Sequence, residues 1–90
     1  MNRVIITVVG KDTVGIIARV CTYLAENKIN ILDISQTIVQ DYFNMIMIVN
    51  VEQSNKDFSV LVSELEETGK DIGVVIKAQK EEIFNRMHRI

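Results

Sequence analysis

The sequence predicts an α+β fold: a ferredoxin-like βαββαβ sandwich with a four-stranded antiparallel sheet, two helices on one face and a C-terminal helical tail. Two observations lead to this prediction. Strand-like and helix-like apolar patterns follow one another in the order strand, helix, strand, strand, helix, strand. The 90 residues contain no proline and no low-complexity run that would mark a linker, so the six elements are expected to form one domain.

The first half of the chain supplies a strand, a helix and a strand. A β-branched run over residues 4–9 predicts the first strand. A helix is expected over residues 14–26, because apolar side chains recur three and four positions apart at Ile17, Val20, Cys21 and Leu24. Asn27 is expected to end this helix in the left-handed conformation.

The second strand is expected over residues 30–39 and alternates between its two faces. Asp33, Ser35 and Thr37 are expected to face outward, and the inward-facing residues are Leu32, Ile34 and Ile38. Gln36 interrupts the inward face, which indicates either a bulge or a strand end there, or a buried amide.

The second half begins with a turn at residues 40–42 and a strand over residues 43–51 that is apolar on both faces. Such a strand needs covering on both sides. The second helix is expected to start with the Ser-x-x-Asp signal at Ser54 and to stop at Gly69. Its apolar stripe consists of Phe58, Leu61, Val62 and Leu65.

A fourth strand over residues 72–79 completes the domain, which therefore spans residues 1–79. The strands that begin at Asn30 and Ile72 are expected at the two edges of the sheet. Residues 80–90 are amphipathic and are expected to form a helical tail that packs on the domain or on a partner subunit.

Composition argues against several classes of function. A net charge of −2 with scattered basic residues argues against nucleic-acid binding. No apolar stretch reaches the roughly eighteen residues of a membrane span, and no signal-like segment is recognised, so a cytoplasmic protein is expected. Cys21 is the single cysteine and His88 the single histidine, so we expect no catalytic residues, no metal and no cofactor. Asp12 and Asp33 could share one end of the fold, where a cap and a surface charge explain them.

The turn at residues 10–16, Gly-Lys-Asp-Thr-Val-Gly-Ile, connects the first strand to the first helix. Asp12 and Thr13 are both candidate N-caps. Gly15 is expected inside the first helical turn, where glycine costs about 1 kcal/mol relative to alanine. Two explanations carry equal weight: close packing of the helix on a neighbour, or access of a ligand to the amides at the positive end of the helix.

Two segments of the chain resemble the ACT domain family. Residues 10–18 contain its Gly-x-Asp-x-x-Gly-Ile turn before the first helix, and residues 27–36 contain the Asn-Ile run that opens the second strand. The resemblance extends over about residues 2–78. Residues 81–90 resemble the ending of short stand-alone ACT proteins related to the glycine-cleavage repressor type.

The resemblance implies a regulatory module that binds a small molecule, most often an amino acid, and that works as a dimer or a larger assembly. It places the ligand where the first turn of one subunit meets the second strand of a neighbour. By position, this implicates Lys11, Asp12, Thr13, Gly15, Asn30 and Ile31. The expected function is regulation of a separate partner enzyme or regulator, and the alternative is a ligand-free structural adaptor.

The sequence itself also favours a homodimer. The edge strand over residues 30–39 contains no proline or lysine that would block pairing with another chain. The second apolar face of the third strand, with Ile46 and Ile48, also requires a cover. We expect two edges to pair into a continuous sheet while the tail covers part of the open face. Stacking of two open faces is the alternative.

Overall fold

The structure, a computed structural model, describes residues 3–11 and 15–82. The predicted order of elements is confirmed in these residues. Their bounds are β1 (Arg3–Lys11), α1 (Ile16–Glu26), β2 (Asn30–Val39), β3 (Tyr42–Asn50), α2 (Phe58–Ile72) and β4 (Val74–Lys80). The predicted helical tail falls mostly on residues 83–90, which lie outside the described part of the chain.

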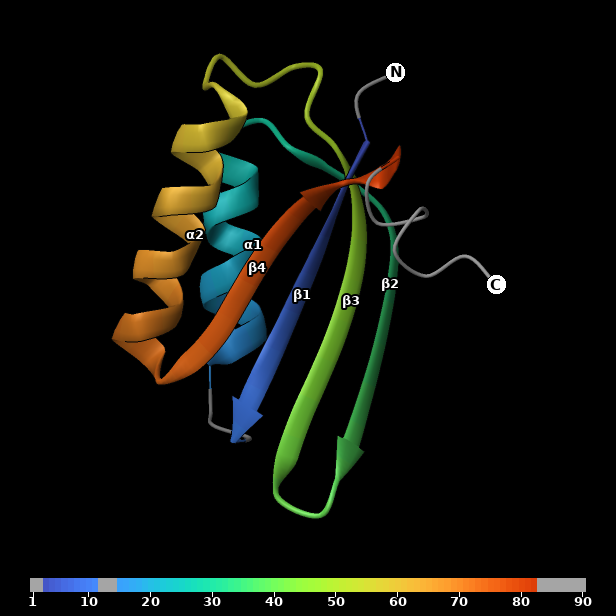
Figure 1. The fold of residues 1–90 in the computed structure, drawn as a ribbon, viewed down its shortest axis with the longest axis vertical. Coiled ribbons are helices and arrows are strands. Elements are labelled where there is room, and N and C mark those ends of the chain that lie inside the picture. Colours follow the sequence, from blue (N-terminus) through green and yellow to red (C-terminus); the bar gives the residue numbers. More distant parts are fainter. Residues whose placement is uncertain (1–2, 12–14, 83–90) are drawn as a thin grey trace.

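The four strands form one antiparallel sheet in the order β2-β3-β1-β4, so β2 and β4 are its edges, as predicted. Both helices pack on the same face of this sheet. In the view of Figure 1 they lie towards the β4 edge, and β2 is the strand farthest from them. The predicted ferredoxin-like sandwich is therefore confirmed, with its helices placed unevenly over the sheet.

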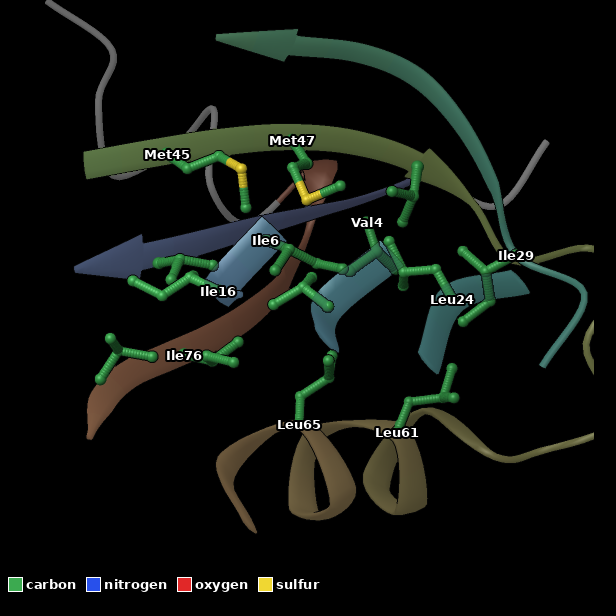
Figure 2. Packing of buried hydrophobic residues seen from close by; sticks show 14 of the residues in the cluster. Val4, Ile6, Ile16, Leu24, Ile29, Met45, Met47, Leu61, Leu65 and Ile76 are labelled. Atoms are coloured by element: carbon green, nitrogen blue, oxygen red, sulfur yellow. The ribbon is translucent and has the colours of Figure 1, made fainter. Parts of the chain in front are cut away.

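The core lies between the helices and the sheet, and Figure 2 shows its side chains converging from both layers. Leu61 and Leu65 are the buried leucines of α2, whereas Phe58 and Val62 of the predicted stripe are only half-buried. The core-facing side of β3 is buried as predicted, and Ile46 is exposed on the opposite face. The buried residues of the cluster are Val4, Ile6, Val8, Ile16, Val20, Leu24, Ile29, Phe43, Met45, Met47, Val49, Leu61, Leu65, Val74 and Ile76.

The C-terminal end of α1 is held by a Schellman motif. The Lys28 amide donates to the Ala25 carbonyl at 3.2 Å, and the Ile29 amide donates to the Leu24 carbonyl at 2.9 Å. Asn27 occupies the C-cap position of α1 and so ends the helix as predicted, but its φ of −102° is not left-handed. The left-handed residue is Lys28, with a φ of 58°, because the motif requires that conformation one position after the cap.

Both predicted ends of α2 are wrong. Asp57, not Ser54, occupies the N-cap position, and the Ser54 hydroxyl instead accepts the Lys56 amide at 3.3 Å within the preceding loop. The helix continues through Gly69 and is capped by Gly73, whose φ is 78°. Gly69 has a packing role, because a Cβ there would lie 2.7 Å from the carbonyl oxygen of Val74 on β4.

The irregularity of β2 lies at its beginning rather than at Gln36. Pairing with β3 shifts between Ile31 and Asp33, which indicates a bulge at Leu32. Both expectations for Gln36, an irregularity or a buried amide, are wrong, because Gln36 lies within the regular part of the strand, opposite Met45, and is exposed.

After this bulge, the prediction of which side chains of β2 point to the helix side of the sheet is correct. The prediction that these side chains are buried is wrong. Ile34 and Ile38 lie opposite Met47 and Phe43, which face the core, so they do point to the helix side of the sheet. They nevertheless remain 41% and 58% exposed. Neither described helix reaches over this edge strand, and an alternating pattern reports the face of a side chain rather than its cover.

Candidate functional site

Gly15 occupies the N-cap of α1 with a φ of 92° and a ψ of 0°. Its predicted place inside the first helical turn is therefore wrong, because the cap falls on Gly15 and not on Asp12 or Thr13, which lie outside the described residues. A Cβ on Gly15 would meet no atom of residues 3–11 and 15–82 within 4 Å, so close packing against this part of the chain does not explain the glycine. The left-handed backbone does, since a residue with a side chain pays about 1–2 kcal/mol there.

In the described residues, no side-chain hydrogen bond caps the amino end of α1. The capping residue, Gly15, has no side chain, and the first turn of the helix contains no acidic residue. The first amides of a helix lack intrahelical partners and carry a partial positive charge, which suits a carboxylate or another anion. Lys11 is exposed at the end of β1, opposite Tyr42 of β3, at the same end of the sheet.

Asn30 and Ile31 lie at the opposite end of the sheet. Asn30 is opposite Asn50, which in turn is opposite Arg3 at the start of β1. β2 runs in the same direction as β1, so its ten residues separate the two groups by about 30 Å. The structure therefore does not bring the described candidates together within one chain.

The side chain of Asn30 is exposed and forms no hydrogen bond with another described residue. An asparagine after α1 could simply close the turn, but in this structure Asn27 has that role rather than Asn30. The Asn27 side-chain amide donates to the Tyr23 carbonyl at 2.9 Å. Asn30 is thus available to a group outside the described part of its own chain.

Asp33 does not lie at the end that carries the first turn, contrary to the possibility raised above. It is opposite Ile48, which is opposite Ile5 near the start of β1. Its carboxylate accepts the backbone N–H of Ile34 at 2.8 Å. Asp33 therefore caps an exposed amide of the sheet edge.

A group of polar side chains that sequence reasoning missed connects the two helices. Glu64 of α2 accepts hydrogen bonds at one carboxylate oxygen from Lys56 at 2.6 Å and from the Tyr23 hydroxyl at 2.7 Å. The bond from Lys56, followed by that from Tyr23, lowers the pKa of the Glu64 carboxyl. Burial, followed by the hydrogen bond to Glu64, raises the pKa of the Tyr23 phenol. The three residues come from separate segments, so no sequence spacing signals them.

A cleft of about 490 Å³ opens at the end of the sheet where β1 begins and α2 starts. Of the predicted site residues, the four that the structure describes (Lys11, Gly15, Asn30 and Ile31) do not line it. Its cationic groups are already engaged: Arg3 lies 3.5 Å from Glu81, Lys56 binds Glu64, and the Lys80 ammonium lies 5.6 Å from the centre of the Phe58 ring. Partnered charges of both signs make this cleft a weak candidate for a ligand site.

The described residues offer no constellation for metal chemistry or for a thiol nucleophile. They contain no group of three His, Cys, Asp or Glu side chains that could hold a metal ion. Cys21 is half-buried against the core, which is the environment of a structural thiol. Among the helices of residues 15–82, none is long and apolar enough to cross a membrane.

Comparisons with known proteins agree with this fold. The family model described as the ACT domain matches residues 2–79. A UPF0237 protein of Bifidobacterium longum is 63% identical over 90 residues, which is 100% of both chains. The solved structure of an ACT domain protein from Streptococcus pneumoniae is 43% identical, has a TM-score of 0.82, and covers 92% of this chain and 93% of its own.

The fold is also found in more distant proteins. A putative glycine cleavage system transcriptional repressor has a TM-score of 0.75 at 19% identity, over 88% of this chain and 45% of its own. At this identity the likeness concerns the fold alone.

Proposed function

Because this chain belongs to the ACT domain family, we propose that it is a non-catalytic regulator that binds an amino acid between two copies of itself. The regulator acts in the cytoplasm on a separate partner, an enzyme or another regulator, according to the occupancy of the site. The proposed site consists of Lys11, Asp12, Thr13, Gly15, Asn30 and Ile31.

One observation carries this proposal: the two halves of the site lie at opposite ends of a single chain. Lys11 and Gly15 lie where β1 ends, and Asn30 and Ile31 lie where β2 starts. A ligand that contacts both halves must therefore lie between two chains. Such a ligand stabilises the assembly by mass action, so binding and dimerisation are coupled.

Antiparallel pairing of two β2 edges brings the halves towards each other. It places the start of β2 in one copy beside the end of β2 in the other, at the end that holds the first turn. Three strand spacings, about 14 Å, then separate the start of β2 from β1 of the second copy. A long side chain such as Lys11 and a ligand of amino-acid size span this distance together.

The chemistry of the two halves matches the two charges of an amino acid. The amides that follow Gly15 receive the carboxylate, since the capping glycine has no side chain to bond them. Asp12 and Asn30 supply oxygen acceptors for the ammonium group.

The open face of the sheet has a cover in this proposal. Val9, Ile46 and Val75 form exposed apolar surface there, on three adjacent strands. The amphipathic residues 80–90 are the proposed cover for part of this surface.

A ligand-free adaptor is the second candidate function. It is favoured by the position of the cleft, which is not lined by Lys11, Gly15, Asn30 or Ile31, the proposed site residues that the structure describes. In an adaptor the β2 edge serves assembly alone, and no amino acid changes the stability of the protein.

A thermal-shift screen of the free amino acids separates the two candidates. At about 100 times its Kd, the correct ligand adds about 2.7 kcal/mol to the free energy of unfolding, which corresponds to a rise in Tm of about 10 °C or more in a domain of this size. A matched screen of an Asn44→Ala variant, which removes an exposed asparagine of β3 outside the site, controls for non-specific effects. Absence of any shift, with dimers present in sedimentation, would leave the adaptor as the function.

A further inference from the structure

Three segments that are distant in the sequence form the cleft at the end of the sheet where β1 begins. They are the start of β1, the loop over residues 51–57 with the first turn of α2, and the end of β4. Figure 1 shows all three at the same end of the molecule. Hydrogen bonds within the loop fix its shape. The Ser54 amide donates to the Val51 carbonyl at 3.0 Å, and the Ser54 hydroxyl accepts the Lys56 amide at 3.3 Å. This wall of the cleft is therefore already formed in the single chain.

The lining of the cleft suits a protein segment better than a free small molecule. Val4 and Leu61 are its buried residues. Val51 and Phe58 add half-buried apolar surface, and every charged residue of the lining is exposed except Glu81, which is half-buried. A small-molecule pocket encloses most of its ligand, whereas a protein interface has an apolar centre and an exposed polar rim.

Two basic residues of the lining are neutralised within the chain. Arg3 lies 3.5 Å from Glu81. The Lys56 ammonium lies 2.6 Å from Glu64, which does not itself line the cleft. The Tyr23 hydroxyl of α1 donates to the same Glu64 oxygen, so Lys56 is tied to the junction between the two helices.

Three acidic residues of the lining have no such partner. The carboxylates of Glu52, Asp57 and Glu82 form no ion pair and no hydrogen bond with another described residue. Asp57 occupies the N-cap of α2, where an aspartate commonly accepts an amide of the first turn, yet its side chain makes no capping hydrogen bond within residues 15–82. The rim of the cleft therefore carries negative charge that the described residues do not compensate.

An aromatic ring of the cleft already receives a cation. The Lys80 ammonium lies 5.6 Å from the centre of the Phe58 ring, within the range of a cation–π interaction. Both residues line the cleft, and Lys80 is exposed. A cation from outside the chain can take the same place, and arginine makes such contacts more often than lysine.

Resting on the function proposed above, we infer that the separate partner docks in this cleft through a basic segment, an arginine or lysine flanked by an apolar side chain. The apolar side chain covers Val51 and Phe58, and the cation pairs with the carboxylates of the rim. Charge complementarity selects this partner, because an acidic segment meets three carboxylates that have no counter-charge in the described residues.

Glu64 has a defined part in this recognition. It binds the Lys56 ammonium and so withholds one positive charge from the rim. Without Glu64, Lys56 is free to pair with the neighbouring Asp57 and competes with the basic side chain of the partner. Glu64 is therefore a positioning residue of the cleft, although it does not line it.

A titration of the full chain, followed by amide chemical shifts in NMR spectra, tests this inference. The probe is the acetylated and amidated peptide Phe-Arg-Leu-Arg, and the matched control is Phe-Glu-Leu-Glu. The basic peptide is expected to shift the amides of residues 51–58 and of the adjoining ends of β1 and β4. These shifts are expected to weaken as the salt concentration rises, and the acidic peptide is expected to cause none of them.

Four variants separate the cleft from the general charge of the protein. Asp57→Asn keeps a good N-cap, so it is expected to fold normally and to bind the basic peptide about two- to fivefold more weakly. Glu52→Gln is expected to have the same effect. Glu64→Gln is expected to weaken binding as well, because it releases Lys56. Glu66→Gln removes an exposed carboxylate of α2 outside the cleft and is expected to leave the affinity unchanged.

The contrary results have distinct meanings. Equal binding of both peptides, an equal loss of affinity in Glu66→Gln, or no shift at about 5 mM peptide would each overturn the inference. The double variant Arg86→Glu and Arg89→Glu tests the basic end of the same chain as the occupant. If it shifts the cleft amides without peptide and binds the peptide more tightly, residues 83–90 occupy the cleft and the partner does not.

The amino-acid ligand is tested separately by the thermal-shift screen. Normal binding of the basic peptide by a protein that no amino acid stabilises would remove the amino acid from the proposed function and leave the docking cleft standing. A protein that an amino acid stabilises but that does not bind the basic peptide would overturn the docking cleft alone.

Discussion

Substitution of Gly15 tests whether the first turn is built for its backbone or for a ligand. Gly15 has a φ of 92°, and a Cβ there would meet nothing within 4 Å in the part of the chain that the structure describes. Gly15→Ala therefore introduces the strain of the left-handed backbone without a steric clash. The expected loss is about 1–2 kcal/mol, or about 4–16 °C in Tm for a domain of this size. Gly15→Asn is expected to melt close to the native protein, because asparagine tolerates this conformation.

The two variants differ in what they predict for binding. Asparagine adds a side chain beside the uncapped amides of α1, so Gly15→Asn is expected to fold and to lose the thermal shift given by the amino acid. Gly73→Ala is the matched control for stability, because Gly73 has a φ of 78° and equally open surroundings at the carboxyl end of α2. Circular dichroism melts and a binding titration measure both effects. A Gly15→Ala protein as stable as the native one would refute the backbone argument, and unchanged binding by Gly15→Asn would remove the site from this turn.

Three further predictions concern other parts of the molecule. Asn30→Ala is expected to weaken amino-acid affinity about five- to a hundredfold. The ligand-free Tm is expected to change little, since the Asn30 side chain has no hydrogen bond with another described residue. A lower Tm with normal binding would assign Asn30 a structural role. Gly69→Ala gains up to about 1 kcal/mol of helix propensity but places a Cβ 2.7 Å from the carbonyl oxygen of Val74. Overpacking of this kind costs about 1–3 kcal/mol, so the urea midpoint of the variant is expected to fall rather than rise. Because the pKa of Glu64 is lowered in the folded state, its carboxylate stabilises the fold at pH values above the ordinary pKa of 4.5, and this contribution is lost as the pH falls through the lower folded pKa. Glu64→Gln is therefore expected to flatten the acid limb of a stability–pH curve. An unchanged acid limb would contradict this prediction.

Periodicity was sufficient to predict the order of elements, and that order, matched to the ferredoxin-like topology, predicted the two edges of the sheet. Periodicity could not predict whether another element covers a side chain. For this reason it wrongly places Ile34 and Ile38 of β2 in the core. Whether a helix reaches over an edge strand depends on where both helices cross the sheet, which no local pattern contains. Helix ends failed for a similar reason: Gly69 and Gly73 are both plausible stops, and only the packing of α2 on β4 distinguishes them.

The sequence names candidate site residues but not where they lie relative to one another. It singles out Gly15 by its motif, whereas the left-handed backbone of Gly15 could be seen only in the structure. The distance between Gly15 and Asn30 follows from strand direction, because β1 and β2 run the same way in this topology. The group formed by Tyr23, Lys56 and Glu64 left no trace in the sequence, since its members are brought together only by the packing of the two helices.

The uneven placement of the helices also has a consequence for how the molecule opens. β1 lies between β3 and β4 and contributes much of the core, whereas β2 is bonded to β3 alone and is exposed almost throughout. Amide hydrogens in β2 are therefore expected to exchange with solvent through local opening, well before those of β1 exchange through global unfolding. The strand that carries Asn30 is thus the most easily released part of the sheet, and any contact that protects it acts on an equilibrium already present in the single chain.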